Sequence, residues 1–182
     1  DGKDIVNFEN ENVFGGAEIV SNTYSNGYGT IEFVSDVTKI GARAFYDNET
    51  LLSITIPSSV ASIGDDAFQS CENLKSVTLS NGLVSIGDDA FLYCKSLESI
   101  KIPSSVKRVG SRAFDYCSNL EKAELDCESI GSYFFNVGVG NLKEIILGNN
   151  VKVIGRSAFS GCRGLTSVTI GNSVTSINSK AF

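Results

Sequence analysis

The chain of 182 residues contains no histidine, no methionine and no tryptophan, and its only prolines are Pro57 and Pro103. Without histidine, neither a Ser-His-Asp nor a Cys-His catalytic arrangement can be built from this sequence. No apolar run approaches the roughly 18 residues that a membrane-spanning helix needs, and the polar start, residues 1–4, lacks the apolar region of a signal peptide. We therefore expect no enzyme and no membrane insertion.

The chain is also short of basic residues. It has 15 Lys and Arg against 21 Asp and Glu, which gives a net charge of −6. Binding to nucleic acid needs a cationic field, so we expect no nucleic-acid partner. Residues 1–100 hold 15 acids and 5 bases (−10), whereas residues 101–182 hold 6 acids and 10 bases (+4). A solvated surface is the simplest interpretation of this asymmetry.

What the sequence does contain is a repeated phrase: a β-branched residue, Gly, two variable residues and, in its typical form, Ala-Phe. The final residues of its copies are Phe45, Phe68, Phe91, Phe114, Phe135, Phe159 and Phe182. The steps between them are 23, 23, 23, 21, 24 and 23 residues. A fixed period in this range is typical of a solenoid, which presents a surface rather than a pocket and so favours a binding function.

One unit shows how a coil is built. Ser53 to Ile56 alternates polar and apolar residues, as a half-buried strand does, and Pro57 ends it. Equivalent strands are predicted at Thr30 to Phe33, Ser76 to Leu79, Ser99 to Ile102, Lys122 to Leu125, Glu144 to Leu147 and Ser167 to Ile170. We expect each coil to add one strand to a parallel sheet with rungs roughly 4.8 Å apart.

A glycine follows the second extended segment of six units, and Asn178 takes its place in the seventh. Because Gly and Asn tolerate positive φ, a left-handed backbone is predicted there. The next residue is Asp or Ser in most units, as in Asp65 and Asp88, and these residue types cap helices. We therefore expect a single helical turn, with the Phe side chains of successive coils stacked inside.

The repeat also sets the predicted domains. Residues 1–29 lack it and are predicted to form an N-terminal cap, whereas residues 30–182 form the solenoid, with seven partial or complete units. Because the sequence stops within a unit, we expect a monomeric fragment of a longer chain. The fifth unit, residues 120–142, is two residues short in its middle and gains one after Phe135, so a kink is expected there.

The consensus Leu-x-x-Ile-x-Ile-Pro-x-Ser-Val-x-x-Ile-Gly-x-x-Ala-Phe-x-x-Cys resembles the BspA-like, bacterial-surface class of leucine-rich repeats. Residues 51–73, 74–96 and 97–119 match it almost position for position. The resemblance implies a right-handed parallel leucine-rich-repeat solenoid with a β-strand face and short helical turns. It further implies a secreted or cell-surface bacterial protein, of a class associated with adhesion to host proteins or other cells.

Four cysteines, namely Cys71, Cys94, Cys117 and Cys162, each follow the repeated Phe by three residues. Equivalent positions of a solenoid form a column, whereas a metal needs ligands that converge on one point. A structural thiol ladder is therefore predicted, with a disulfide between neighbouring coils or a metal as the less favoured alternatives, and no cofactor is expected. Cys127 lies off this ladder.

Candidate binding residues lie at the outward positions of the predicted strands. A central group departs from the Ser/Thr pattern on either side of it: Ser99, Lys101, Lys122, Glu124, Glu144 and Ile146. An exposed aliphatic side chain beside charged ones is a possible anchor for a partner, although a solvated face is the plain alternative. A second candidate is the pair Tyr93 and Tyr116 on the convex side, at equivalent positions of adjacent coils.

These observations lead to a functional hypothesis. The chain is a non-catalytic module that binds an extracellular protein or glycan through its sheet face, within a secreted or cell-surface bacterial protein, in adhesion or host interaction. A preformed rigid surface loses little ordering entropy on binding. The alternatives are a structural spacer and an accessory module of a larger surface protein or enzyme.

Overall fold

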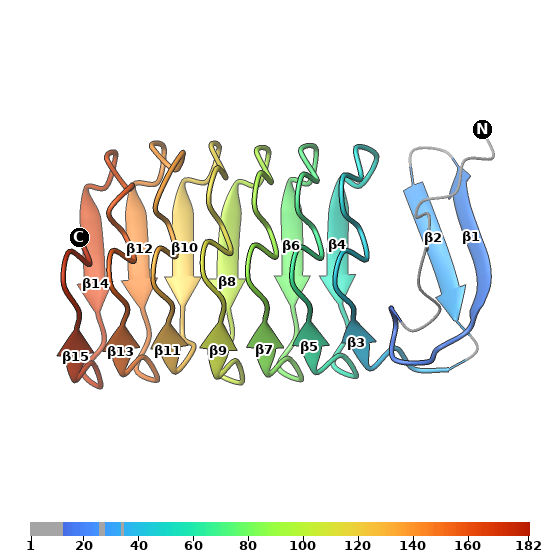
Figure 1. Ribbon diagram of the computed structural model, residues 1–182, viewed down its shortest axis with the longest axis horizontal. Coiled ribbons are helices and arrows are strands. Elements are labelled where there is room, and N and C mark those ends of the chain that lie inside the picture. The colour runs from blue at the N-terminus through green and yellow to red at the C-terminus, as the bar shows by residue number, and fades with distance from the viewer. Residues whose placement is uncertain (1–12, 26–27, 34) are drawn as a thin grey trace.

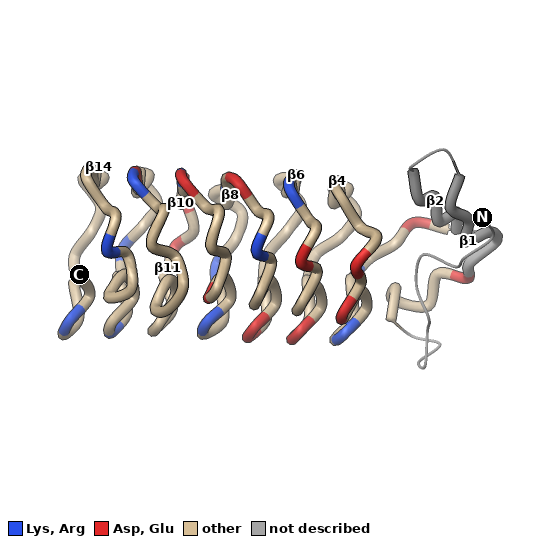
Figure 2. Tube along the Cα trace, turned by 90° about the horizontal axis from the view of Figure 1, so that it is seen from above, with Lys and Arg blue, Asp and Glu red and all other residues tan. Residues whose placement is uncertain are grey.

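The computed structural model describes residues 13–25, 28–33 and 35–182. From residue 39 onward the chain forms a parallel-strand β-solenoid with the predicted period, and its coils follow one another along one axis (Figures 1 and 2). The long strands are β4 (Ser53–Ile56), β6 (Ser76–Leu79), β8 (Ser99–Ile102), β10 (Lys122–Leu125), β12 (Glu144–Leu147) and β14 (Ser167–Ile170). The short strands are β3 (Lys39–Ile40), β5 (Ser62–Ile63), β7 (Ser85–Ile86), β9 (Arg108–Val109), β11 (Ser129–Ile130), β13 (Val153–Ile154) and β15 (Ser176–Ile177).

Each coil contributes one long and one short strand to two parallel sheets. The short strands form one seven-stranded sheet that runs from β3 to β15. The long strands form two groups, β4-β6 and β8-β10-β12-β14, and β6 lies beside β8 without a ladder between them. The long sheet continues in register through the irregular fifth unit, with Leu125 paired to Ile102 on one side and Leu147 on the other. The kink expected there therefore does not interrupt the sheet.

The core is a column of stacked phenylalanine rings, as predicted. Ring centroids lie 4.9 Å apart for Phe45 and Phe68, 5.0 Å for Phe68 and Phe91, and 5.1 Å for Phe91 and Phe114. The rings are within 6° of parallel in these pairs. A single coil cannot bury such a ring, because each of its faces is covered by the next coil.

The turn after each repeated glycine differs from the prediction in two ways. No helix occurs in the part of the chain that the structure describes, so the expected helical turn is replaced by a non-helical one. The left-handed residue is not the glycine but the residue two positions later. These residues, with φ between 53° and 58°, are Arg43, Asp66, Asp89, Arg112, Tyr133, Ser157 and Lys180.

The glycine is needed for a different reason, which is the close approach of neighbouring coils. A Cβ atom on Gly64 would lie 2.5 Å from the amide nitrogen of Ala42, and one on Gly155 would lie 2.6 Å from the carbonyl carbon of Gly131. At this position each coil hydrogen-bonds directly to the one before it, as when the Gly64 amide donates to the Ile40 carbonyl over 2.8 Å. Any side chain would force the coils apart.

Asp65 and Asp88 also act between coils rather than as helix caps. Asp65 Oδ1 accepts a hydrogen bond from the Asp88 amide over 2.9 Å, and Asp88 Oδ1 accepts one from the Ser111 amide over 2.8 Å. Each carboxylate therefore satisfies a backbone donor of the following coil. The residue types were interpreted correctly as backbone acceptors, but the donor belongs to another unit.

At the N-terminal end, β1 (Ile19–Ser25) and β2 (Tyr28–Phe33) form an antiparallel hairpin. The strand predicted at residues 30–33 is thus present in β2, but it pairs with β1 rather than with the parallel sheet. Val13, Phe14 and Ala17 are buried against the first coil. Residues 1–12, 26 and 27 of the predicted cap lie outside the described residues. Across the residues described, no helix is long and apolar enough to cross a membrane.

Candidate binding surfaces

The candidate residues on the sheet face occupy alternate positions of β8, β10 and β12. Ser99 and Lys101 are exposed, and Lys122, Glu124, Glu144 and Ile146 are half-buried. The residues between them, such as Ala123 and Ile145, point into the core and are fully buried. The alternation of a strand thus separates the face from the core, as the sequence pattern indicated.

Four of these residues form a continuous chain of ion pairs, which we call the sheet-face network: Lys101, Glu124, Lys122 and Glu144. Lys101 Nζ lies 3.1 Å from Glu124 Oε2. Lys122 Nζ lies 3.3 Å from Glu124 Oε1 and 3.1 Å from Glu144 Oε2. The parallel register produces these contacts, because it sets Glu124 opposite Lys101 and Lys122 opposite Glu144.

The ion pairs of the network shift the pKa values of two of its members. Hydrogen bonds from Lys101 and then Lys122 lower the pKa of Glu124. Hydrogen bonds to Glu144 and then Glu124 raise the pKa of Lys122. The pairing therefore favours the charged forms of Glu124 and Lys122, and the formal charges of the four residues sum to zero. Such a patch attracts no single sign of charge, but it presents donors and acceptors in fixed places.

Ile146 stands at the edge of the network. It pairs in register with Glu124 on β10 and with Thr169 on β14. The outward positions that flank the network on other strands are exposed hydroxyl residues, namely Ser53, Thr55, Ser76, Thr78, Ser167 and Thr169. The central patch thus combines one aliphatic side chain and four paired charges on an otherwise uncharged face.

Tyr93 and Tyr116 lie on another part of the coil, in the turn after the repeated Phe. Their rings stack with centroids 4.5 Å apart and 21° between planes. Lys95 Nζ lies 5.9 Å from the Tyr93 ring centroid, and the Tyr116 ring lies over Gly138, where an added Cβ would be 2.7 Å from Tyr116 Cδ1. The two rings therefore cover one face of each other, and Lys95 and Gly138 lie close to the pair.

Both tyrosines have a left-handed backbone, with φ of 62° and 58°. This conformation is uncommon for a bulky residue, and the equivalent positions of earlier coils carry Asp47 and Ser70. Val137 is 40% exposed next to them, and its carbonyl accepts a hydrogen bond from the Tyr116 amide over 2.7 Å. The pair thus belongs to a small exposed apolar group.

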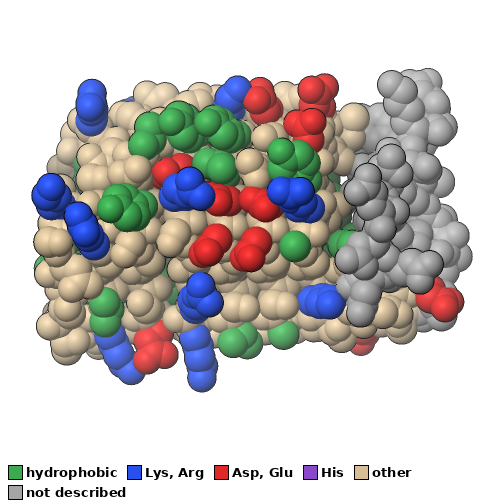
Figure 3. Space-filling view, in the orientation of Figure 1, with side chains coloured by type: hydrophobic (Ala, Val, Ile, Leu, Met, Phe, Trp, Pro, Cys, Tyr) green, Lys and Arg blue, Asp and Glu red, His purple; other side chains and the backbone are tan. Residues whose placement is uncertain are grey.

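The turns that follow the repeated glycines form a face of the solenoid, which we call the turn face. A row of charges on it was not anticipated from the sequence. Arg43 Nε lies 3.4 Å from Asp66 Oδ2, and an Arg112 guanidinium nitrogen lies 2.7 Å from Asp89 Oδ2. Figure 3 shows basic and acidic side chains in a row on this face, with hydrophobic side chains gathered above them. The signal was present in the sequence, because all four residues stand two positions after the repeated glycine.

The Asp115 side chain binds the backbone next to the exposed apolar group of Tyr93, Tyr116 and Val137. It is 2% exposed, and its Oδ1 accepts hydrogen bonds from the amides of Asn136 (2.6 Å) and Val137 (3.2 Å). Burial raises the pKa of this carboxyl group. The sequence did not single it out, because its donors come from the residues around the insertion in the next unit.

The cysteines form the predicted ladder of free thiols. The Sγ atoms of Cys71, Cys94 and Cys117 donate to the carbonyls of Phe45, Phe68 and Phe91 over 2.9, 3.2 and 3.3 Å. All five cysteines are buried and free. Burial raises the pKa of Cys71, Cys127 and Cys162 to about 12. They are therefore unreactive thiols that satisfy backbone groups and fill the core.

Known proteins share this architecture. The family model "BspA type Leucine rich repeat region" matches residues 17–137 and 128–182, with six copies. The chain belongs to this family. No curated protein matches the sequence.

Several solved structures are similar. A leucine-rich repeat protein of T. pallidum is 33% identical over 78% of this chain and 67% of its own, with a TM-score of 0.69. A leucine-rich cell surface protein of Faecalibacterium prausnitzii is 25% identical over 99% of this chain and 52% of its own, with a TM-score of 0.65. A leucine-rich repeat protein of Bacteroides ovatus is 27% identical over 88% of this chain and 53% of its own, with a TM-score of 0.61. The chain thus spans about half to two thirds of the length of these proteins.

Proposed function

We propose that this chain is a non-catalytic binding module of a secreted or cell-surface bacterial protein. It recognises an extracellular protein or glycan through the sheet face, in adhesion or host interaction. The observation that carries this proposal is the sheet-face network beside Ile146, on a face that otherwise presents Ser and Thr. The similarity to a protein described as a cell surface protein supports the proposed location.

The physical case rests on rigidity and on the pattern of the patch. Ladders hold β10 on both sides, so the network residues are placed before a partner arrives and little ordering entropy is lost. Paired charges give orientation and specificity more than affinity. Ile146 supplies the apolar contact around which a small interface forms.

The state of the carboxylates supports a non-catalytic role. Glu124 is engaged by two lysines and its pKa is lowered, so it does not hold a proton for general acid catalysis at neutral pH. Glu144 is paired with Lys122. The lysines are in turn paired with these carboxylates, and the raised pKa of Lys122 favours its protonated form, which is not a nucleophile.

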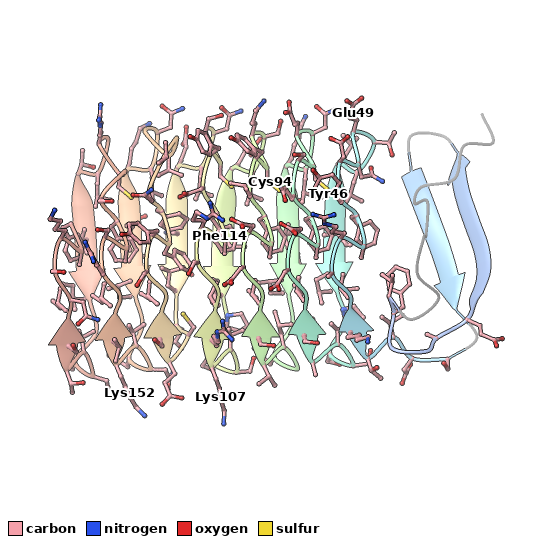
Figure 4. All side chains as sticks on the ribbon, viewed as in Figure 1. Tyr46, Glu49, Cys94, Lys107, Phe114 and Lys152 are labelled. Carbon is pink, nitrogen blue, oxygen red and sulfur yellow. The ribbon has the colours of Figure 1, made fainter. Side chains whose placement is uncertain are left out.

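The test is a binding screen of the purified chain against extracellular-matrix proteins and glycans. A sheet-face variant, Lys101→Ser with Lys122→Ser and Ile146→Thr, removes the patch. The matched control, Lys107→Ser with Lys152→Ser and Val84→Thr, makes the same three kinds of change at other sites. Figure 4 shows Lys107 and Lys152 projecting from the edge that carries the short strands.

Binding that the sheet-face variant loses and the control keeps would support the proposal. Binding that both variants keep would contradict it and direct attention to the turn face, where Tyr93→Asn with Tyr116→Asn tests the stacked pair. The continuous stack of coils favours a second function, a rigid spacer or accessory module within a larger protein. A folded chain that binds nothing in the screen would make this second function the better one.

A further inference from the structure

Tyrosine is the readily oxidised side chain that this chain presents at its surface. The sequence has no histidine, methionine or tryptophan, and all five cysteines are buried. Burial keeps these thiols protonated and out of reach of an oxidant. A one-electron oxidant that meets the folded chain therefore takes its electron from the phenol of a tyrosine.

Two of the tyrosines are stacked on each other. Tyr93 and Tyr116 both stand two residues after the repeated Phe, in adjacent coils. Their ring centroids lie 4.5 Å apart, with 21° between the ring planes. Tyr93 is half-buried and Tyr116 is 37% exposed, so the pair reaches the surface. Tyr46 and Tyr133 are exposed as well, but neither stacks on another tyrosine among the side chains that the structure describes.

The backbone holds the two rings in this arrangement. Both residues have the same left-handed conformation, with φ of 62° and 58°, so their side chains leave the coils in the same direction. The Tyr93 amide donates a hydrogen bond to the Asp115 carbonyl over 3.0 Å, and the Tyr116 amide donates one to the Val137 carbonyl over 2.7 Å. Each turn is thus bound to the next coil, and the distance between the rings follows the spacing of the coils.

Face-to-face stacking is the geometry in which two phenoxyl radicals couple. When a phenol loses an electron and its proton, the unpaired electron spreads over the oxygen and the ring carbons ortho and para to it. The para carbon of tyrosine carries the side-chain methylene, so bond formation takes place at an ortho carbon. The new bond forms along the normal to the rings, where the π orbitals of stacked rings overlap. Holding both rings in this orientation replaces a bimolecular encounter by an intramolecular step.

We propose that Tyr93 and Tyr116 form a site of oxidative modification, at which hydrogen peroxide and a haem peroxidase join the two rings as dityrosine. Each phenol loses one electron and one proton, and the two ortho carbons then form a single bond. Each bonded carbon releases its hydrogen as a proton while its own oxygen gains one, which restores both phenols. The two electrons and two protons removed reduce one hydrogen peroxide to two water molecules. The link joins two coils covalently beside the irregular fifth unit.

Treatment of the purified chain with a haem peroxidase and hydrogen peroxide tests the proposal. Dityrosine is detected by its fluorescence, and mass spectrometry of the proteolysed chain locates the link. We expect a product that is lighter by two hydrogen atoms, that joins Tyr93 to Tyr116 within one chain, and whose yield does not change on dilution. Tyr93→Phe keeps two stacked rings but removes one phenol, and it should abolish the product. The control Tyr133→Phe should retain it.

A matched pair of variants tests the stacking itself. The same position of the preceding coil holds Ser70, which has a similar backbone with φ of 61°. Ser70→Tyr with Tyr116→Phe leaves two phenols in adjacent coils. Ser70→Tyr with Tyr93→Phe leaves them two rungs apart, at roughly 10 Å. The two variants have the same composition, and only the first should form dityrosine within one chain.

The contrary results are equally distinct. A main product that joins two chains, or that involves other tyrosines, overturns the proposal because the stack then does not direct the coupling. Equal yields from the two Ser70 variants overturn it for the same reason. A chain that forms no dityrosine under conditions that couple free tyrosine also overturns it, because the stacked rings are then held too rigidly to react.

Discussion

The regular units, residues 51–119, and the irregular fifth unit, residues 120–142, solve the same packing problem in different ways. In the regular units, flat rings stack within 6° of parallel and at almost constant spacing. In the fifth unit, Phe135 is tilted by 53° from Phe114 and by 35° from Phe159. The long sheet nevertheless passes through in register. Register is therefore preserved at the cost of ring stacking.

Carboxylate side chains replace the backbone that the fifth unit lacks. Where regular units have a longer turn after the strand, Asp126 accepts hydrogen bonds from the Asn150 amide (3.0 Å) and from Asn150 Nδ2 (2.9 Å). Where the unit gains a residue, Asp115 accepts from the Asn136 and Val137 amides. A deletion or insertion is tolerated in a solenoid when a side chain satisfies the groups that lose their partner in the next coil.

Core volume is redistributed in the same unit. Phe134 stands where other units have a small residue, such as Ala113 and Ala158. Ala123 stands where the neighbouring long strands have Ile100 and Ile145. Both exchanged residues are fully buried. A large residue in one column and a small one in another keep the total volume close to that of a regular coil.

The largest expected effect comes from replacing Phe134 with the alanine that other units have, while Ala123 is left unchanged. Phe134→Ala should lower the free energy of unfolding by about 3–5 kcal/mol, because it leaves a cavity in a rigid stack. Adding Ala123→Ile should recover part of this loss. Chemical denaturation of both variants measures the coupling. A double variant that recovers none of the lost stability would show that the two columns do not compensate each other.

The second prediction separates two reasons for a glycine within one coil. Gly155→Ala should cost about 1–3 kcal/mol or more through overpacking, because its Cβ would meet the backbone of Gly131. Ser157→Gly, at the residue with φ of 53°, should be tolerated because glycine accepts that backbone readily. Thermal unfolding compares the two. The opposite ranking would restore the conformational explanation that the sequence first indicated.

This difference shows what the repeat predicts and what it does not. The strand positions, the Phe column and the cysteine ladder were predictable, because each is a buried or hydrogen-bonded position that recurs with the period. The role of Gly64 was not, because it depends on the distance to Ala42 in another coil. A single unit read alone supplies conformational preference but no information on how closely its neighbour approaches.

The candidate surfaces were predictable to a similar degree. Alternation along the strands identified Lys101, Lys122 and Glu124 as outward residues, and the parallel register then fixes which charges meet. The contact of Tyr116 with Gly138 and the hydrogen bonds to Asp115 were not predictable. Gly138 and the donors to Asp115 belong to a unit whose alignment shifts by one residue after Phe135. Contacts between coils in an irregular unit do not follow the fixed spacing of the repeat, so this spacing cannot predict them.

The third prediction tests the carboxylate that holds the irregular unit. Asp115→Ala leaves two buried amides without an acceptor and should cost about 1–3 kcal/mol. Asp115→Asn keeps an acceptor oxygen and should cost less. Because burial raises the pKa of Asp115 in the folded chain, folding favours its protonated form, and its ionisation opposes folding as the pH rises through the folded pKa. Stability profiles of the parent and the Asn variant against pH should differ in that range and converge below it.

The fourth prediction concerns the stacked tyrosines. Tyr93→Asn with Tyr116→Asn relieves a left-handed backbone that costs bulky residues roughly 1–2 kcal/mol each, and it removes stacking worth about 0.5–1.5 kcal/mol. Because the relief at two residues exceeds the stacking lost by one pair, the variant should be at least as stable as the parent. A large loss of stability would show that these rings are part of the core packing rather than a surface feature.

The smallest effect is expected in the sheet-face network, because its charged groups reach the surface and solvent screens each pair. The pKa of Glu124 is lowered in the folded chain, so its pairing stabilises the fold above the unfolded pKa of glutamate and is lost as the pH falls through the folded value. Lys101→Ser with Lys122→Ser should raise the pKa of Glu124, which carboxyl NMR titration measures directly. An unchanged pKa would mean that the ion pairs do not persist in solution, and the patch would then have no fixed arrangement of charges to present to a partner.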